Sequence, residues 1–372
     1  MKVAAVKVTD YNYAEVERGL KEALELLGGM ERFVNGGDRV LIKPNMLEAL
    51  PPEKAVTTNP ELVRAVIREV RKAGAVPLVG DSPGTTGTLK AAEKCGILAV
   101  CREEGAELVL FDKTVEMSYP EGEMIKKFTV ASCLNEVDKV ISLAKMKTHT
   151  FMGITGATKN LFGCIVGMEK AQFHLRMQAR QEFAGMIIDL ASLLRPVLSI
   201  VDGVVGMEGN GPRNGIPVKA GVMLAGESCL AVDIVMAEMM GFSSERIPLT
   251  ALALERQLTL PFSEIELVGD ARDIRLKFLE PRSLKSLEER VPRWLAKFGR
   301  SHLTAQPEIA VNCIGCGRCV AHCPPKAMRI SNSRATINYN VCIRCYCCQE
   351  LCPANAVSLR EGRLLKLVRR FL

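Results

Sequence analysis

Apolar positions in the first 281 residues follow two spacings, which together predict alternating strands and helices. Short β-branched or fully apolar runs indicate buried strands, at residues 2–8, 39–43, 76–79, 108–111, 137–143, 197–201 and 218–224. Apolar residues at helical spacing indicate helices, at residues 14–27, 60–73, 173–194 and 231–240. Strands separated by helices predict an α/β domain over residues 1–281, with a large, mostly parallel sheet and helices on both faces.

The pattern changes near residue 282. Charged residues become dense over 282–306, and Pro292 and Gly299 interrupt the periodicity. We interpret this stretch as a linker with a short helix near residues 294–298. A small cysteine-rich α+β domain is predicted for residues 307–360, and a basic amphipathic tail for residues 361–372. We expect the tail to dock onto the protein itself, with membrane contact as the alternative.

Cysteine spacing is the strongest chemical signal in the chain. Nine of the 14 cysteines lie between Cys313 and Cys352. They form the pattern Cys-x2-Cys-x2-Cys-x3-Cys-Pro twice, with the two copies 29 residues apart. This spacing is typical of ferredoxins with two [4Fe–4S] clusters, whereas four-cysteine zinc sites usually pair two shorter CxxC arms. The repeat therefore predicts a ferredoxin-like module that transfers electrons.

The expected ligands cross between the two copies, because the fourth cysteine of each run binds the other cluster in two-cluster ferredoxins. The first cluster is expected to use one set of four, Cys313, Cys316, Cys319 and Cys352. The second is expected to use the complementary set, Cys342, Cys345, Cys348 and Cys323. Cys347 is spare by this pattern. We interpret it as a small apolar side chain near the second cluster, with a redox role as the alternative.

Composition and charge exclude several function classes. The formal net charge is +7, and residues 305–372 carry ten Lys or Arg against three Asp or Glu. Two bound clusters would offset about four of these charges, so we do not expect nucleic-acid binding. Transmembrane segments are not expected, because every long apolar stretch is broken by charged residues. Asp10 lies where a signal peptide would need apolar residues, so we expect a cytoplasmic protein without a disulfide framework.

The large domain contains stretches such as VLIKPNMLEALPPEKAVTTNPELVRAVIREVRKAGA (40–75), VGDSPGTTG (79–87), KMKTHTFMGITGATKNLFG (145–163) and VDGVVGMEGNGPRNGIPV (201–218). In these stretches the chain resembles the domain-of-unknown-function family 362. The resemblance implies that a ferredoxin-like tail of this kind is a common companion of the domain. It implies no single activity.

Polar residues follow several predicted strands directly. These residues are Lys43, Asn45, Asp81, Ser82, Lys145, Lys147, His149 and Asp202. Because parallel sheets bind ligands at the carboxyl ends of their strands, we expect them to converge on one cleft. Glycine-rich segments after Asp81 and Asp202 have backbone amides that could hold an anion, with simple tight turns as the alternative.

The candidate catalytic residues are His149, Lys147 and Asp81, with His149 as a general acid or base. The candidate residues for binding an anionic substrate or cofactor are Lys43, Asn45, Ser82, Lys145, Lys159, Asp202, Glu208 and Asn210. A basic surface patch is the alternative interpretation of the lysines. The sequence shows neither a P-loop nor GxGxxG nor GxSxG, so it does not support ATP or NAD binding or hydrolase chemistry.

Two functions remain after these exclusions. The first is an iron–sulfur oxidoreductase that relays electrons through two [4Fe–4S] clusters to a small anionic substrate or cofactor in the α/β domain. The second is a non-catalytic electron carrier or docking subunit, in which the large domain recognises a redox partner protein. The sequence leaves open whether a flavin or another organic cofactor also binds.

Overall fold

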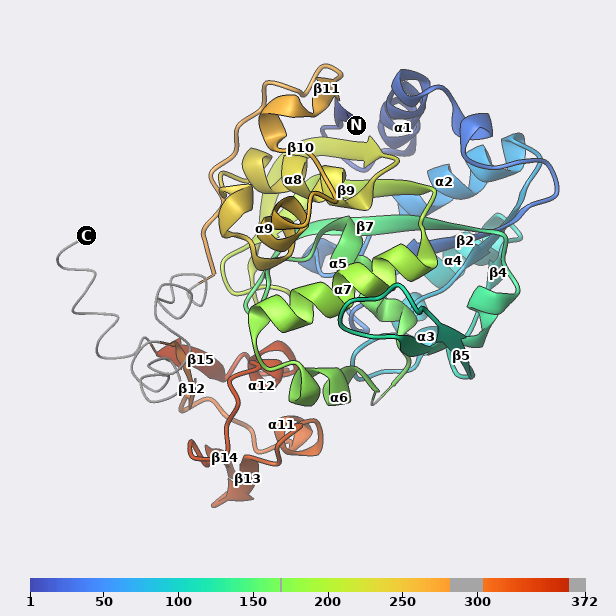
Figure 1. Ribbon diagram of the computed structural model, residues 1–372. Coiled ribbons are helices and arrows are strands. Elements are labelled where there is room, and N and C mark those ends of the chain that lie inside the picture. The colour runs from blue at the N-terminus through green and yellow to red at the C-terminus, as the bar shows by residue number, and fades with distance from the viewer. Residues whose placement is uncertain (168, 282–303, 361–372) are drawn as a thin grey trace.

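A computed structural model describes residues 1–167, 169–281 and 304–360. Residues 1–281 form a large α/β domain, and residues 304–360 form a small module at one end of it (Figure 1). The predicted helix at 294–298 and the basic tail at 361–372 lie outside the described residues. Within the described residues, no helix is both long and apolar enough to span a bilayer.

The large domain is built on a nine-stranded sheet with the order β11-β1-β10-β9-β7-β2-β3-β4, to which β8 adds beside β7. Its strands are β1 (Lys2–Lys7), β2 (Arg39–Pro44), β3 (Val76–Val79), β4 (Glu107–Leu108), β7 (Lys139–His149), β8 (Gly153–Ile154), β9 (Leu198–Glu208), β10 (Ile216–Gly226) and β11 (Glu266–Val268). The block from β9 to β4 is parallel, and β10 runs antiparallel between β9 and β1. The sheet is mixed but mainly parallel.

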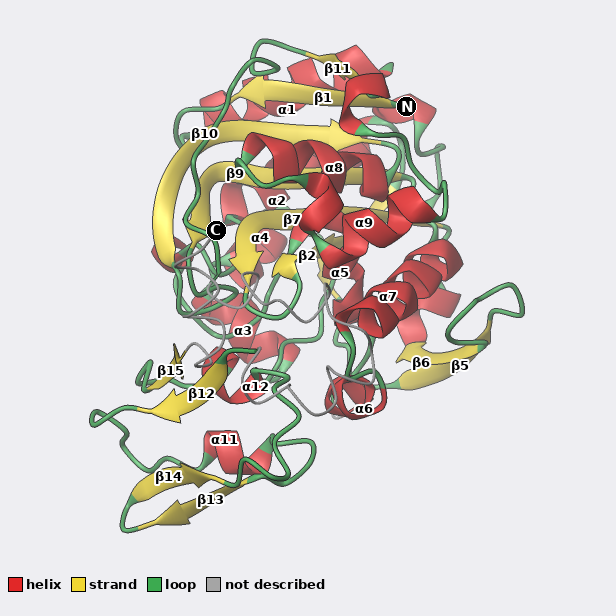
Figure 2. Ribbon diagram, turned by 60° about the vertical axis from the view of Figure 1, so that its left-hand side comes forward, coloured by secondary structure: helices red, strands yellow, loops and turns green. Residues whose placement is uncertain are grey.

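Helices cover both faces of this sheet (Figure 2), as the sequence predicts. One hydrophobic core lies under α1 (Tyr13–Leu27), α2 (Pro60–Lys72), α3 (Thr88–Lys94) and α4 (Ile97–Glu103). The other lies under α5 (Gly156–Asn160), α6 (Glu169–Arg176), α7 (Arg180–Leu194), α8 (Cys229–Met239) and α9 (Pro248–Glu255). Neighbouring residues of β1 alternate between the two cores, which is the period expected of a strand buried on both sides.

The structure differs from the sequence-based expectation at three places. The helix predicted at 173–194 is two helices, α6 and α7, with a break before Arg180. A two-stranded sheet of β5 (Thr114–Ser118) and β6 (Lys127–Ala131) was not predicted. Only residues 209–215 of the glycine-rich segment after Asp202 form a loop, because β9 continues to Glu208 and the chain returns as β10. Pairing with β10 satisfies the backbone of this glycine-rich segment, so Gly203 and Gly206 are strand residues.

The cysteine module preserves the repeat seen in the sequence. Strand β12 (Gln306–Ile309) pairs with β15 (Val357–Arg360), and β13 (Met328–Ser331) pairs with β14 (Arg334–Ile337). Helices α11 (Arg318–Ala321) and α12 (Cys347–Glu350) occupy equivalent places 29 residues apart. The left-handed backbone is also repeated, at Gly317 before α11 and at Tyr346 before α12. Helix α12 lies next to the α/β domain, whereas β13 and β14 lie at the far end (Figures 1 and 2).

Candidate functional site

The eight predicted cluster cysteines line two separate hollows in the module. Cys313, Cys316, Cys319 and Cys352 lie around the first hollow. Cys323, Cys342, Cys345 and Cys348 lie around the second. Each hollow therefore combines three cysteines of one repeat with the last cysteine of the other, which is the crossed grouping that two-cluster ferredoxins use.

Backbone amides point at several of these sulfur atoms. The amide of Ala356 donates to Cys352 Sγ at 3.1 Å, and the equivalent amide of Ala327 donates to Cys323 Sγ at 3.2 Å. Such bonds stabilise thiolate charge and tune the potential of an iron–sulfur centre. Four thiols with amide donors beside them fit a [4Fe–4S] cluster.

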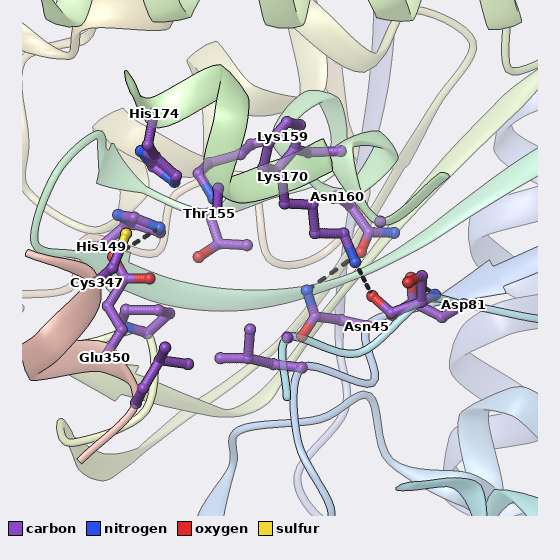
Figure 3. Close-up of a pocket in the computed structure, with 18 of the residues that line it drawn as sticks. Asn45, Asp81, His149, Thr155, Lys159, Asn160, Lys170, His174, Cys347 and Glu350 are labelled. Carbon is purple, nitrogen blue, oxygen red and sulfur yellow. Dashed lines mark hydrogen bonds and ion pairs between the residues drawn. The ribbon is translucent and has the colours of Figure 1, made fainter. Parts of the chain in front are cut away.

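A cavity of about 140 Å³ lies between the carboxyl ends of the central strands and the cysteine module (Figure 3). From the α/β domain it is lined by side chains that include Lys43, Asn45, Asp81, Ser82, Lys147, His149, Thr155, Lys159, Asn160, Lys170 and His174. From the module it is lined by His322, Cys347, Glu350 and Leu351. The cavity is thus walled by both parts of the chain.

Two of the cavity lysines are completely buried but differ in their partners. Lys43 Nζ forms an ion pair with Asp81 Oδ1 at 2.7 Å. Lys147 Nζ instead donates to Asn45 Oδ1 at 2.9 Å and to the Val56 carbonyl at 2.6 Å, and neither acceptor carries a charge. Burial lowers the pKa of Lys147 well below its usual value, and the neighbouring lysines act in the same direction. Lys147 is therefore a buried amine whose ammonium form would be stabilised by an anion in the cavity.

Two further lysines add positive charge at the cavity wall. Burial lowers the pKa of Lys159 to about 8, although Glu350 and Cys347 favour its charged form. Burial also lowers the pKa of Lys170 to about 8. The Lys170 ammonium donates to the carbonyls of Ser82 and Pro83, which ties helix α6 to the loop after β3. Four lysines thus face two carboxylates, Asp81 and Glu350, around one cavity.

His149 has a defined orientation at the junction of the two parts. Its Nδ1 accepts the amide protons of Phe151 at 3.1 Å and Met152 at 3.3 Å, which places the ring proton on Nε2. Nε2 faces Glu350 Oε1 of the cysteine module at 3.5 Å. Burial and nearby lysines lower the pKa of His149 well below its usual value, so the ring is neutral.

Several polar atoms at the cavity are buried without a hydrogen-bond partner among the described residues. They are Thr155 Oγ1, His174 Nδ1 and Glu350 Oε1. Buried polar groups are normally paired, because an unpaired one costs about 1–3 kcal/mol. Three such atoms beside one cavity indicate that it takes a polar occupant.

Cys347 connects this cavity to the module. Its side chain lines both the cavity and the second hollow. It is mostly buried and lies in sequence between Cys345 and Cys348. Cys347, which belongs to neither predicted cluster set, therefore lies between the cavity and the second hollow.

The structure separates the predicted site residues into two groups. Lys43, Asn45, Asp81, Ser82, Lys147, His149 and Lys159 line the cavity. Lys145, Asp202, Glu208 and Asn210 do not. Lys145 Nζ and Asp202 Oδ2 pair with each other at 2.8 Å. Asp202 also accepts the hydroxyl of Tyr11 at 2.6 Å, so this cluster is closed by its own members. Asp202 lies inside β9, not at its end, because the strand continues past it.

Glu208 and Asn210 act in contacts within the chain. Glu208 Oε2 accepts the amide of Leu279 at 2.9 Å, and the Asn210 carbonyl accepts from Gln349 Nε2 at 3.0 Å. The Asn210 carbonyl therefore joins the turn between β9 and β10 to helix α12 of the cysteine module, whereas Glu208 contacts Leu279 within the α/β domain.

The sequence analysis missed Thr155, Asn160, Lys170, His174, Cys347 and Glu350 as cavity residues. One signal was available for the last two. The two cysteine repeats differ at these positions, where Cys347 and Glu350 stand in the places of Arg318 and Ala321. Departures from an internal repeat mark the copy that faces the α/β domain.

Comparisons with known proteins match the large domain and the cysteine module separately. The model of a family described as a domain of unknown function (DUF362) matches residues 40–238. A model described as a 4Fe-4S dicluster domain matches residues 312–356, which supports iron–sulfur clusters and an electron-transfer role for the module. A thylakoid-associated protein of Synechocystis is 34% identical over 278 residues, covering 72% of this chain and 86% of that protein.

Two further similar proteins match a smaller share of this chain. One subunit of the ion-translocating oxidoreductase complex of Methanosarcina acetivorans is 40% identical over 50 residues, which are 13% of this chain and 19% of that protein. The lactate racemase apoprotein of Thermoanaerobacterium thermosaccharolyticum is similar with a TM-score of 0.36 and 15% identity. That match covers 61% of this chain and 54% of the racemase.

Proposed function

The chain belongs to the DUF362 family and carries a 4Fe-4S dicluster domain, and from this premise we propose that it is an iron–sulfur oxidoreductase acting on a small anion. The observation that carries the proposal is the shared cavity. Lysines of the α/β domain line one side of it, and Cys347 and Glu350 of the cysteine module line another. A pure carrier would not need a lysine-lined cavity beside its redox module.

Two sets of four cysteines would hold the clusters, Cys313, Cys316, Cys319 and Cys352 in one set and Cys342, Cys345, Cys348 and Cys323 in the other. Clusters of this type supply transfer of one electron each at low potential. The Cys347 side chain lines both the second hollow and the cavity, so it would lie between the second cluster and the bound anion.

The lysines would bind and orient the anion. Lys147 is the strongest candidate, because its amine is fully buried and has no carboxylate partner among the described residues. An anion beside it would restore the ammonium form and offset the cost of burial. Asp81 positions Lys43 through the buried ion pair and also accepts the amide of Met46 at 2.7 Å, which fixes the β2 end of the cavity.

His149 would donate or accept a proton during the reaction. Its Nε2 carries the ring proton and points toward Glu350, at the junction of the two domains. A reduction that adds electrons to an anion generally needs protons as well, and a neutral imidazole at the cavity wall can donate or accept one. Backbone amides on Nδ1 hold this tautomer in place.

The test is to identify the molecule that the protein retains. Anaerobically purified wild-type protein, Lys147→Ala and Lys219→Ala are denatured, and the released small molecules are identified by mass spectrometry. Lys219 is an exposed lysine on β10, outside the cavity, and serves as the matched control. We expect an anionic metabolite or cofactor from wild type and Lys219→Ala, and at least tenfold less from Lys147→Ala.

The retained molecule then allows a functional test. Added to protein with reduced clusters, it should restore the visible absorbance of the oxidised clusters in wild type. It should do so at least tenfold more slowly in Lys147→Ala and His149→Ala. Unchanged rates in both variants, with clusters intact, would favour the non-catalytic carrier instead.

A further inference from the structure

The two cysteine loops are equivalent in sequence but differ in exposure. In the second loop Cys345 is 9% exposed and Tyr346 is 3% exposed. At the matching positions of the first loop, Cys316 is exposed and Gly317 is half-buried. Ile314 is 67% exposed, whereas the matching Ile343 is half-buried. A symmetric repeat thus has one covered loop and one open loop.

The covered loop is held against the rest of the chain. The Tyr346 hydroxyl donates to the Ala305 carbonyl at 3.0 Å, and Cys347 lies at the cavity. In the open loop, Arg318 pairs with Glu48 of the α/β domain at 2.8 Å, whereas Ile314 and Cys316 stay exposed. The neighbours of this loop include Val311, which is 89% exposed, and Ile330 of β13, which is 41% exposed. Ile314 and Ile330 line the first hollow, and Val311 precedes Cys313 in the same segment; these three exposed apolar residues are what we call the open-loop surface.

Exposed apolar side chains around a redox site indicate a protein interface, because isolated surface Ile and Val residues are common but a group beside a functional centre is not. Ile314 and Ile330 themselves line the first hollow. A carrier seated on them would therefore contact the hollow that Cys316 also lines.

The charges around the open-loop surface define its partner. Arg329 and Arg334, on β13 and β14, are both exposed. Arg334 donates to the carbonyls of Ile309 and Ala310, next to Val311. Residues 304–360 contain one exposed acidic side chain, Glu308, and it lies 3.9 Å from Arg360 on the other sheet of the module. The charged rim of the surface is thus cationic.

Resting on the proposed function, we propose that the open-loop surface docks a small acidic one-electron carrier protein of the ferredoxin type. Its apolar centre and basic rim complement an acidic partner, and charge complementarity speeds encounter and selects among carriers. The covered loop faces the substrate cavity and the open loop faces the carrier, so the repeat gives the module two different ends.

The test measures binding, independently of turnover. Reconstituted full-length protein is titrated with an acidic bacterial ferredoxin, and in parallel with basic cytochrome c, by isothermal titration calorimetry at low and high salt. The variants are Ile314→Asp, Arg329→Glu and the control Leu89→Asp, which alters an exposed leucine on α3 of the α/β domain. Arg329→Glu also serves if Ile314→Asp fails to hold iron.

We expect wild type and Leu89→Asp to bind ferredoxin, and salt to weaken the binding. Ile314→Asp and Arg329→Glu should each weaken it at least tenfold, and cytochrome c should not bind. Equal ferredoxin affinity in all variants, or tighter binding of cytochrome c, overturns the docking proposal. Failure of the cavity proposal is seen separately, because retention of the anion depends on Lys147 and ferredoxin binding does not.

Discussion

His149 and Glu350 face each other across the junction of the two domains, with His149 Nε2 3.5 Å from Glu350 Oε1 (Figure 3). They are 201 residues apart in sequence. This pair, with Cys347 beside it, places one wall of the cavity in the redox module. The cavity is therefore lined by both parts of the chain, and variants on either side test the two proposed roles separately.

Adjacent cysteines of α12 should behave differently. Cys348→Ala should lose at least half of the iron, because it removes a thiol of the second set. Cys347→Ala should keep about eight iron per chain, since Cys347 is outside both sets. Iron analysis and visible spectra of anaerobically reconstituted protein measure this. Loss of iron in Cys347→Ala with full iron in Cys348→Ala would reverse the ligand assignment.

The buried Lys43–Asp81 pair should matter for stability. Lys43→Met leaves the Asp81 carboxylate buried without its cation, which should lower the free energy of unfolding by about 3–5 kcal/mol. The matched control is Lys2→Met, which breaks the exposed Lys2–Glu266 pair and should cost at most about 1 kcal/mol. Urea unfolding of both variants measures the two losses in free energy of unfolding, and equal losses would contradict the prediction.

Stability should fall in mild acid, partly because of His174. Burial lowers the pKa of His174 from 6.5 to about 3, so the folded protein keeps the ring neutral where the unfolded chain protonates it. The contribution of His174 to the free energy of unfolding is complete above about pH 6.5. It decreases as the pH falls toward about 3, by about 1.4 kcal/mol per pH unit. His174→Phe, which preserves the stack on Phe183, should lose about 1.4 kcal/mol less than wild type between about pH 7 and pH 5.5. Identical losses in the two proteins would show that the ring is not held neutral.

Glu48 should control how firmly the module is docked. Its carboxylate accepts from Arg318 of the module at 2.8 Å and also pairs with Arg213 of the turn after β9. Glu48→Gln removes the shared negative charge and should increase hydrogen exchange in α12 severalfold. Glu53→Gln, at an exposed site nearby, is the control and should leave α12 unchanged. Equal protection of α12 in both variants would mean that Glu48 does not hold the module.

The ferredoxin-like module and the helix-covered sheet were largely predictable. Cysteine spacing is a local property, because a loop that wraps a cluster needs its thiols at fixed intervals. The apolar periodicity also reports burial locally, and it located most strands and helices of the large domain. The break before Arg180 was missed, since both helices carry apolar residues at similar spacing.

The candidate site was only partly predictable. Lys145 and Lys147 differ by two residues on β7, yet Lys145 is neutralised by Asp202 and Lys147 reaches the cavity. Nothing in their spacing distinguishes them, because their partners come from other strands. Lys170 and His174 were missed for a similar reason, since α6 is brought to the cavity by the packing of the chain around it.

The sequence by itself determined which residues can form a two-cluster module and that an α/β domain precedes it. Only the tertiary structure decided that the second cysteine loop is largely buried beside the lysines whereas the first is largely exposed. The physical reason is that a repeat specifies the same local loop twice, whereas burial depends on contacts with residues distant in the chain. Gln349, Glu350 and Cys347 acquire their roles from that contact, and the repeat shows only that Cys347 and Glu350 depart from it, not which residues they meet.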